Sequence, residues 1–524
     1  MPIKKIRKIK FYDTTLRDGA QTEGISLSLE DKIQIAHRLD QFGMHYVEGG
    51  WPGSNPKDMA FFKEIQKRKL RRAKIVAFGS TRRAHTKVAS DINVKGLLES
   101  KTQVITIFGK SWDFHVKKVF RTSLKENLSM IYETVAYLKS KKKEVIYDAE
   151  HFFDGFRENP DYAIKTLQQA ARAGADNITL CDTNGGTMPH EIRRAILRVK
   201  RSLRVPLGIH CHNDAELAVA NSIQAVGEGC ELVQGTINGY GERCGNANLV
   251  SVIPILQAKM NRSCFSPRKM KELTQVSHFV AEICNMPLQP NQAFTGRSAF
   301  AHKGGVHINA MMKSAKTYEH MDPKLIGNRR RYLVSELGGK TNVMLKAREL
   351  QLDFSKESPE ARRILAEVQK LENEGYQFEA AEASFELLVQ MLLGKAKTLF
   401  KVKKVSVRAE DIGDKIPVSV AEVKLFAKNK EYFVVAEGDG PVNALDSALR
   451  KALRSSYPAV DDIRLTDYKV RVVNSEAGTA AKVRVFIQFQ DKNRSWTTVG
   501  VNENIIEASW KALVDAVEYK LLKG

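Results

Sequence analysis

The sequence predicts an α/β protein with three parts: a (β/α)8 TIM barrel, helical linker subdomains, and a C-terminal α+β domain with an internal repeat. Three observations support this fold class. Short apolar runs alternate with segments of helical periodicity up to about residue 285. Polar, glycine-rich text follows each of those runs at once. The end of the chain, from about residue 401, contains two halves with related patterns.

The barrel is predicted from the number and spacing of its strands. Amphipathic stretches such as Leu29–Phe42, Leu124–Lys139, Tyr162–Ala173 and Glu216–Glu228 separate the strand candidates. Eight strands separated by helices within roughly 250 residues favour a closed barrel over an open sheet. The strand candidates are Lys8–Tyr12, Tyr46–Gly49, Lys74–Phe78, Val104–Phe108, Glu144–Tyr147, Asn177–Cys181, Leu207–His210 and Leu232–Thr236.

The sequence that follows each predicted strand indicates where the chemistry takes place. In chain order it reads DTTLRDG, EGGWPGSNP, FGSTRR, FGKSWD, YDAEHFFDG, CDTNGG, HCHND and NGYGERCGN. In a TIM barrel, the loops at the C-terminal ends of the strands build the active site. We therefore expect the functional residues of the barrel within these eight segments.

Three domains are expected along the chain. The barrel occupies residues 1–285, and residues 286–400 form linker subdomains that can reach back over it. Within residues 401–524, EYFVVAEGDGPVNALDSALRKAL and SWTTVGVNENIIEASWKALVDAV each give strands followed by a helix. Two such units can pack into a pseudo-symmetric pocket or a dimer surface.

The net charge of +23 comes from 83 basic and 60 acidic side chains. Such an excess is compatible with nucleic acid, an acidic surface or anionic small substrates. The lysines are dispersed, however, and no helix-turn-helix, zinc-finger or aromatic RNA-binding signature is present. The densest run, Lys139 to Lys143, ends a predicted helix, where cations suit the helix dipole. We interpret the charge as a solvated surface and expect no nucleic-acid partner.

The lengths of the apolar stretches and the spacing of the cysteines indicate a cytoplasmic protein with no membrane partner. No stretch approaches the ~18 uninterrupted apolar residues of a membrane span. The basic N-terminus, MPIKKIRKIKFYD, lacks the apolar run of a secretory signal. The six cysteines have no pair-like spacing, which is typical of reduced thiols rather than a disulfide framework.

A metal site is predicted at the ends of the first, seventh and eighth strands. The spacing His-x-His places the imidazoles of His210 and His212 on one face of the seventh strand. Asp18 follows the first strand, which lies near the seventh in a closed barrel. Asn246, in GERCGN, can add an amide oxygen. This ligand set leaves positions open for a bidentate ligand such as a 2-oxo acid. The alternative for Asp18 alone is a turn residue.

Four further residues are candidates for binding and proton transfer. The guanidinium of Arg17 is suited to neutralising an enolate oxygen or a substrate carboxylate, with a salt bridge at the barrel mouth as the alternative. Asp148 and Glu150 are expected after the fifth strand, both facing the mouth, where Glu150 could move protons or orient a base. Thr183 follows the sixth strand and can bind a substrate carboxylate, or else stabilise a turn.

Four segments taken together are highly specific: DTTLRDGAQ, CDTNGG, HCHND and GERCGN. With them the chain resembles the DRE-TIM metallolyase superfamily, in its Claisen-condensing branch of 2-isopropylmalate, homocitrate and citramalate synthases. The similarity runs from about Ile9 to the C-terminus. It includes GDGPVNALDSAL, which looks like the regulatory dimerisation domain of isopropylmalate synthases.

The resemblance implies a role for each matching residue of the barrel. Asp18, His210, His212 and Asn246 look like the metal ligands, for Mn²⁺, Mg²⁺, Co²⁺ or Zn²⁺. Arg17 resembles the arginine that holds the substrate oxygens and steadies the enolate.

Further matches imply the proton-transfer groups. Glu150 aligns with the catalytic glutamate of the family, and Thr183 with its carboxylate-binding threonine. In AFAHKGGVHINAMMKSAKTYEH, His307 looks like the general base or its relay, with Tyr318 assisting. His302 is the nearby alternative to His307.

Within this branch, EGGWPGSNPKD, AFGSTRR, FGKSWDFHV and YDAEHFFDG resemble bacterial citramalate synthases more than isopropylmalate synthases. The implied reaction joins acetyl-CoA, pyruvate and water into (R)-citramalate and CoA, in isoleucine biosynthesis. The first alternative is a 2-isopropylmalate synthase, with a larger pocket for a branched oxo acid. A carbon–carbon lyase is the second, and the regulatory-like C-terminal domain argues against it.

The last part of the chain is interpreted as an effector-binding module that forms a homodimer. Residues 401–524 contain no candidate for a metal ligand or a base. The GDGPV turn opens a helix, whose backbone N–H groups can hold the carboxylate of an amino acid. Isoleucine is the effector we expect, and a purely structural dimerisation domain is the alternative.

Overall fold

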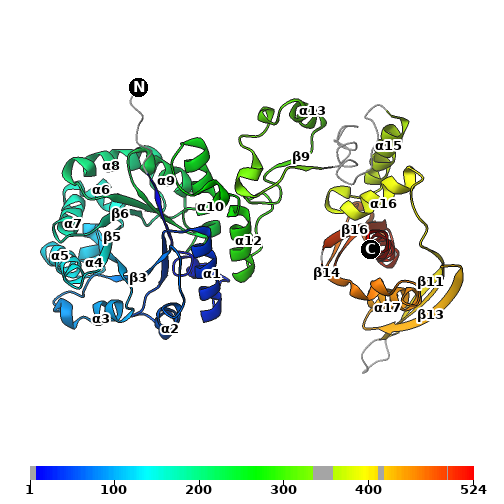
Figure 1. Cartoon of the computed structure of the whole chain (residues 1–524), viewed down its shortest axis with the longest axis horizontal. Coiled ribbons are helices and arrows are strands. Elements are labelled where there is room, and N and C mark those ends of the chain that lie inside the picture. The colour runs from blue at the N-terminus through cyan, green and yellow to red at the C-terminus, as the bar shows by residue number, and fades with distance from the viewer. Residues whose placement is uncertain (1–7, 334–357, 411–417, 493) are drawn as a thin grey trace. The chain divides into compact units, whose positions relative to one another are not determined.

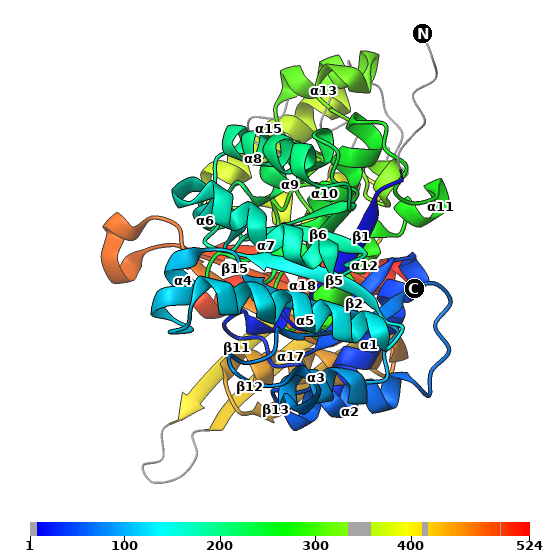
Figure 2. The same cartoon turned by 90° about the vertical axis from the view of Figure 1, so that its left-hand side faces the viewer.

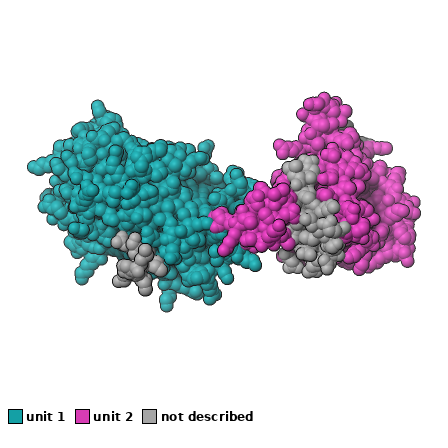
Figure 3. Space-filling view, turned by 90° about the horizontal axis from the view of Figure 1, so that it is seen from above, with its two compact units in different colours: residues 1–300, 321–329 teal, residues 301–320, 330–524 magenta. Residues whose placement is uncertain are grey.

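The computed structural model describes residues 8–333, 358–410, 418–492 and 494–524 (Figure 1). The chain divides into two compact units, which Figure 3 distinguishes by colour. The first comprises residues 1–300 and 321–329, and the second comprises residues 301–320 and 330–524.

The first unit is a closed barrel of eight parallel strands in sequential order. Strand β1 pairs with β2 on one side and with β8 on the other, which closes the sheet. This confirms the predicted fold class. The strands are β1 (Lys10–Asp13), β2 (Tyr46–Gly50), β3 (Lys74–Ser80), β4 (Val104–Lys110), β5 (Glu144–Glu150), β6 (Asn177–Asp182), β7 (Leu207–Cys211) and β8 (Leu232–Gly235).

Helices surround the barrel on its outer face, as Figures 1 and 2 show. Their ends follow local sequence signals. In α1, Ser28 forms a capping box with Asp31, and the left-handed Gly43 ends the helix. The helices are α1 (Leu29–Phe42), α2 (Pro56–Ile65), α3 (Ile92–Glu99), α4 (Asp113–Lys118), α5 (Leu124–Ser140), α6 (Phe152–Glu158), α7 (Pro160–Arg172), α8 (Pro189–Ser202), α9 (Ala218–Gly227), α10 (Leu249–Pro254), α11 (Pro267–Met270) and α12 (Leu273–Ile283).

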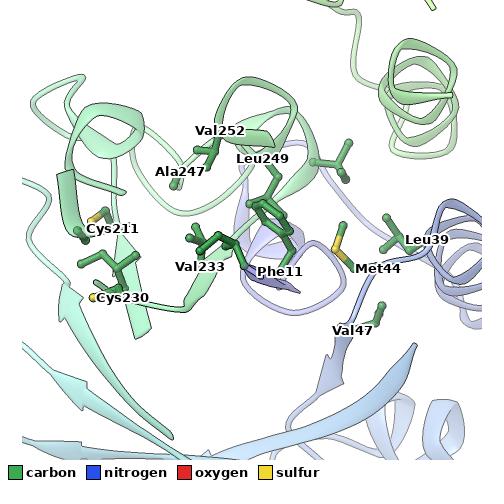
Figure 4. Close-up of a cluster of buried hydrophobic side chains, with 14 of the residues drawn as sticks. Phe11, Leu39, Met44, Val47, Cys211, Cys230, Val233, Ala247, Leu249 and Val252 are labelled. Atoms are coloured by element: carbon green, nitrogen blue, oxygen red, sulfur yellow. The ribbon is translucent and has the colours of Figure 1, made fainter. Parts of the chain in front are cut away.

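Side-chain alternation along the strands gives the barrel two apolar layers. Phe11 faces outward and belongs, with Met44 and with Leu39 of α1, to the buried cluster between strands and helices (Figure 4). Its neighbour Tyr12 points inward. There it joins a smaller buried cluster inside the barrel, made of Tyr12, Tyr46, Val76, Val104, Ile146 and Leu232. The barrel is therefore filled at this level, and its open space lies toward the C-terminal strand ends.

The strands differ from the sequence prediction mainly at their ends. Strand β5 continues to Glu150, so Asp148 and Glu150 lie in the strand and not after it, which corrects the prediction. Lys8 makes only an isolated bridge to Ser263, and β1 begins at Lys10. Polar residues extend β5 because neighbouring strands supply their backbone hydrogen bonds.

The second unit contains two three-stranded antiparallel sheets, each followed by a helix. This confirms the predicted internal repeat. One repeat is β11 (Phe400–Glu410), β12 (Val418–Ala427), β13 (Lys430–Gly438) and α17 (Pro441–Leu453); the other is β14 (Arg464–Val472), β15 (Val483–Gln490), β16 (Ser495–Asn502) and α18 (Ile505–Lys523). The shorter elements before them are β9 (Ala301–His302), α13 (Gly305–Lys313), β10 (Arg331–Tyr332), α15 (Pro359–Asn373) and α16 (Glu382–Leu392).

Two further observations concern the whole described chain. None of the six cysteines, all of which lie in described residues, forms a disulfide. Among the described residues, no helix is both long and apolar enough to cross a membrane.

Candidate active site

A pocket of about 230 Å³ opens at the C-terminal ends of the barrel strands. It brings together seven of the residues singled out from the sequence. These are Arg17, Asp18, Asp148, Glu150, Thr183, His210 and His212. The remaining lining residues are Gln21, Trp51, Phe78, Phe108, Cys181 and Glu242. The pocket is thus polar where strands β5 to β7 and the loop after β1 meet, and aromatic beside β2 to β4.

Asp18, His210 and His212 form a cluster with the geometry of a metal site. Their ligand atoms all lie within 4.8 Å of one another, and all three residues are buried. The Nδ1 atom of His212 and the Oδ1 atom of Asn246 are buried and have no hydrogen-bond partner in the described structure. Buried polar atoms rarely stay unpaired. The residues therefore fit a divalent cation, for which these two atoms would be ligands.

The loop after β8 places Asn246 beside this cluster. Asn246 donates from Nδ2 to the Oδ2 atom of Asp18 at 2.8 Å, and its backbone bridges to that of His212. A Cβ atom at position 241 would lie 2.1 Å from Asn246 Oδ1. Only glycine can occupy position 241 without moving the amide of Asn246. The GYG segment, which ends at this glycine, is therefore part of the site.

Gln234 orients the first histidine. Its Oε1 atom lies 3.0 Å from Nδ1 of His210, and its Nε2 atom donates to Asp148 at 2.8 Å. This contact leaves Nε2 of His210 facing Asp18 Oδ2, 3.5 Å away. Burial lowers the pKa of both histidines, that of His212 to about 4. Both rings are therefore neutral at neutral pH, the form that binds metal.

Arg17 is held in place from three sides. Its Nε atom donates to Glu48 at 2.5 Å, its Nη2 atom lies 3.6 Å from Asp18, and its guanidinium lies 3.8 Å from the Phe78 ring centroid. Burial opposes the charge of Arg17, but Glu48 and Asp18 outweigh it and raise the pKa of the guanidinium. Arg17 is thus a fixed cation in the pocket wall.

Asp18 and Asp148 differ in protonation although both are buried. Burial would raise the pKa of Asp18, but Arg17 and the two histidines bring it down to about 2. Burial and the charge of Glu48 raise the pKa of Asp148 to about 8. Asp18 is therefore a carboxylate ligand, whereas Asp148 is mostly protonated at neutral pH and can donate a hydrogen bond.

Thr183 lies directly after β6 and also has a structural role. Its Oγ1 atom accepts a hydrogen bond from the backbone N–H of His151 at 2.9 Å, and its carbonyl accepts one from Arg243 at 2.8 Å. The hydroxyl proton remains available to the pocket. The two readings of Thr183 from the sequence, a turn hydroxyl and a substrate ligand, are therefore compatible.

Comparison with known proteins places the barrel in a family. The HMGL-like family model matches residues 8–280, and members of that family use a divalent metal. An (R)-citramalate synthase from Geobacter sulfurreducens is 54% identical over 98% of both chains. One from Aquifex aeolicus is 53% identical, also over 98% of both chains. The chain belongs to the (R)-citramalate synthase family.

Membership of this family makes the chain an enzyme of the acyltransferase class. A 2-isopropylmalate synthase from Methanocaldococcus jannaschii is more distant, at 31% identity over 98% of this chain and 95% of the relative. Two further family models match the rest of the chain. "Homocitrate synthase post-HMGL domain-like" matches residues 294–376, and "LeuA allosteric (dimerisation) domain" matches residues 379–521.

His307 and Tyr318 belong to the second unit and lie together there. Their rings are stacked, with centroids 4.0 Å apart and an interplanar angle of 25°. His302 instead lies 3.4 Å from Glu319, which also binds Arg330. Of the two histidines, His302 is thus engaged by a buried carboxylate, whereas the ring of His307 contacts the tyrosine predicted to assist it.

Sequence reasoning missed the buried residues that support the pocket. Glu48 binds Arg17 and also Tyr12, and its side chain is fully buried. Gln234 links His210 to Asp148, and Lys110 pairs with Glu150. A charged or amide group inside an apolar strand run, as in YVEGG and LVQG, is the signal that could have found Glu48 and Gln234.

Proposed function

We propose that the chain condenses acetyl-CoA with pyruvate and hydrolyses the thioester, giving (R)-citramalate and CoA. The observation that supports this most is the identity of 54% and 53% to two (R)-citramalate synthases over 98% of the chain. The pocket agrees with the proposal, because it combines a fixed cation, a cluster suited to a metal and two carboxyl groups.

Asp18, His210 and His212, with Asn246, would hold a divalent ion such as Mn²⁺, Mg²⁺, Co²⁺ or Zn²⁺. An ion bound there supplies Lewis-acid polarisation of the 2-oxo acid. The protein's part is to present one carboxylate and two neutral imidazoles in fixed orientations. Asp18 keeps its charge because Arg17 lies beside it.

Arg17 and Thr183 would bind the oxygens of the oxo acid. The Arg17 guanidinium is fixed by Glu48 and Phe78, so it loses little conformational freedom when a substrate oxygen arrives. The protonated Asp148 offers a further hydrogen bond from the floor of the pocket. These groups stabilise the oxygen on which negative charge develops as the new carbon–carbon bond forms.

The proton of the acetyl methyl group would be taken by His307, with Tyr318 and Glu150 assisting. The stacked Tyr318 ring restrains the His307 imidazole. Glu150 lines the pocket as a partly exposed carboxylate beside Lys110. A base and a fixed cation together allow the enolate of acetyl-CoA to form and attack the ketone carbon of pyruvate. Water then hydrolyses the thioester.

The substrate is tested with a panel of 2-oxo acids. We expect pyruvate to give faster turnover than 2-oxoisovalerate at equal concentration with acetyl-CoA, because Trp51, Phe78 and Phe108 fill one side of a pocket of only about 230 Å³. Each extra methyl or methylene group is worth about 1–3 kcal/mol in such a pocket. Release of free CoA is followed with a thiol reagent.

Product identity is the control for this assay. Chiral chromatography should show (R)-citramalate from pyruvate. Faster CoA release with 2-oxoisovalerate would make the chain an isopropylmalate synthase, and CoA release without a condensation product would make it a thioesterase.

The second unit would form a homodimer and bind isoleucine. Gly440 precedes α17 with extended backbone, and no side chain caps the helix, whereas Asn504 caps α18. The backbone N–H groups at the start of α17 can therefore donate hydrogen bonds to a ligand carboxylate. A Cβ atom at Gly440 would meet nothing within 4 Å, so other residues fit at this position.

We expect Gly440→Asp to weaken inhibition by isoleucine. The new carboxylate would cap α17 itself and compete with the amino acid. The isoleucine concentration for half-inhibition should rise about fivefold, since a cap contributes about 1 kcal/mol. The uninhibited rate should not change. Gly440→Ala is the matched control, because it adds a side chain without a carboxylate. Equal inhibition of both variants would place the effector elsewhere.

A further inference from the structure

Lys110 lies at the end of β4, directly beside Glu150 at the end of β5. The two residues are register partners across the parallel pair of strands, so both side chains project from the same level of the barrel mouth. They form an ion pair. Glu150 lines the pocket, whereas the Lys110 side chain is only 10% exposed. A buried lysine is therefore paired with a carboxylate that faces the pocket.

The surroundings of Lys110 restrict its choice of partner. Two aromatic rings enclose its ammonium group, with the centroid of Phe108 at 5.5 Å and that of Phe120 at 5.6 Å. In the part of the chain that the structure describes, Glu150 is the carboxylate within ion-pair distance of it. A buried lysine charge is costly without an anion nearby. Lys110 thus depends on Glu150 as its counter-ion.

Other titratable groups face the pair from neighbouring elements. His115 of α4 senses both charges, since Lys110 lowers its pKa and Glu150 raises it, although burial and His151 lower it more. Asp154 of α6 is occupied by His151 and Arg157. Asp154 is therefore paired with other groups, and in the described structure Lys110 is the cation that pairs with Glu150.

We propose that Lys110 is a positioning residue for the reaction: it fixes the direction of the Glu150 carboxylate. This inference rests on the proposed function, in which Glu150 assists proton transfer. Strand pairing supplies the alignment, because both residues belong to rigid elements and not to loops. The aromatic rings hold the ammonium group, and the ammonium group holds the carboxylate.

The separate effects on kcat and KM should reveal this role. A misdirected carboxylate slows proton transfer without weakening the binding of pyruvate, so removal of the lysine should lower kcat and leave KM nearly unchanged. Replacement by arginine should restore most of kcat, because the cation returns.

The test compares Lys110→Met, Lys110→Arg and the control Lys74→Met. Lys74 also pairs with a glutamate of β5, Glu144 at 2.6 Å, but at the opposite end of the barrel. We expect Lys110→Met to lower kcat roughly 10- to 100-fold, with KM for pyruvate within about twofold. Lys110→Arg should recover most of kcat, and Lys74→Met should match the wild type.

A double-mutant cycle with Glu150→Gln separates positioning from general damage. In that background Lys110→Met should change kcat by less than about twofold, because the carboxylate that it serves is gone. An equal loss of kcat in both backgrounds, or a failure of Lys110→Arg to recover kcat while it folds normally, would overturn the proposal. Lack of condensation by the wild type itself would instead overturn the proposed function. Melting temperatures identify variants that fail to fold, and Lys110→Arg then decides.

Discussion

Replacing His212 by alanine should lower kcat by on the order of a thousandfold, since Lewis-acid catalysis contributes several kcal/mol. His212 is one of three buried groups whose ligand atoms lie within 4.8 Å of one another. Its Nδ1 atom has no protein partner in the described structure, so the substitution breaks no hydrogen bond of that atom. The fold should therefore survive, while the affinity for the divalent ion falls sharply.

Metal content provides a readout that does not depend on turnover. Wild-type and variant proteins are loaded with Mn²⁺, dialysed and measured by elemental analysis, and their melting temperatures are compared with and without the ion. Wild type should retain about one ion per chain and melt higher with it. His190→Ala is the control, because His190 is an exposed histidine of α8. Near-normal activity and metal content in His212→Ala would remove His212 from the ligand set.

The convergence of Asp18, His210 and His212 was predictable because it depends on backbone geometry. Alternation along β7 sends His210 and His212 to the same side. Barrel closure then brings the end of β1, and with it Asp18, close to β7, because only β8 lies between them. Both rules can be applied to a sequence without knowing any side-chain conformation. The same reasoning placed Thr183 at the pocket.

The supporting residues were not predictable in the same way. Glu48 meets Arg17 and Tyr12 through side chains that converge inside the barrel. Such contacts depend on rotamers and on the inward layer of the barrel, which the periodicity of one strand does not determine. For a related reason, Glu150 was predicted to follow the fifth strand, whereas it is the last residue of β5. A polar side chain at this position is typical of a loop, but the backbone pairing with strand β4 extends β5 to this residue.

Replacing Arg17 by lysine should lower kcat/KM for pyruvate by about 100-fold, even though the charge is kept. Loss of one oxyanion-binding donor typically costs this much or more. The guanidinium of Arg17 binds Glu48 through Nε and lies 3.8 Å from the Phe78 ring centroid, which leaves its remaining N–H groups for the pocket. A lysine ammonium group is a point charge with no planar fork, so it cannot keep Glu48 and serve substrate in the same geometry.

Arg82→Lys is the matched control for this substitution. Arg82 is also a buried arginine that binds two carboxylates, Glu126 and Glu133, at 2.7 Å each, and it does not line the pocket. Both variants should lose stability, since each breaks a buried set of charge-assisted hydrogen bonds. Only Arg17→Lys should lose catalytic efficiency toward pyruvate. If both variants retain wild-type kcat/KM, Arg17 is a structural ion-pair residue at the barrel mouth and another group binds the substrate oxygens.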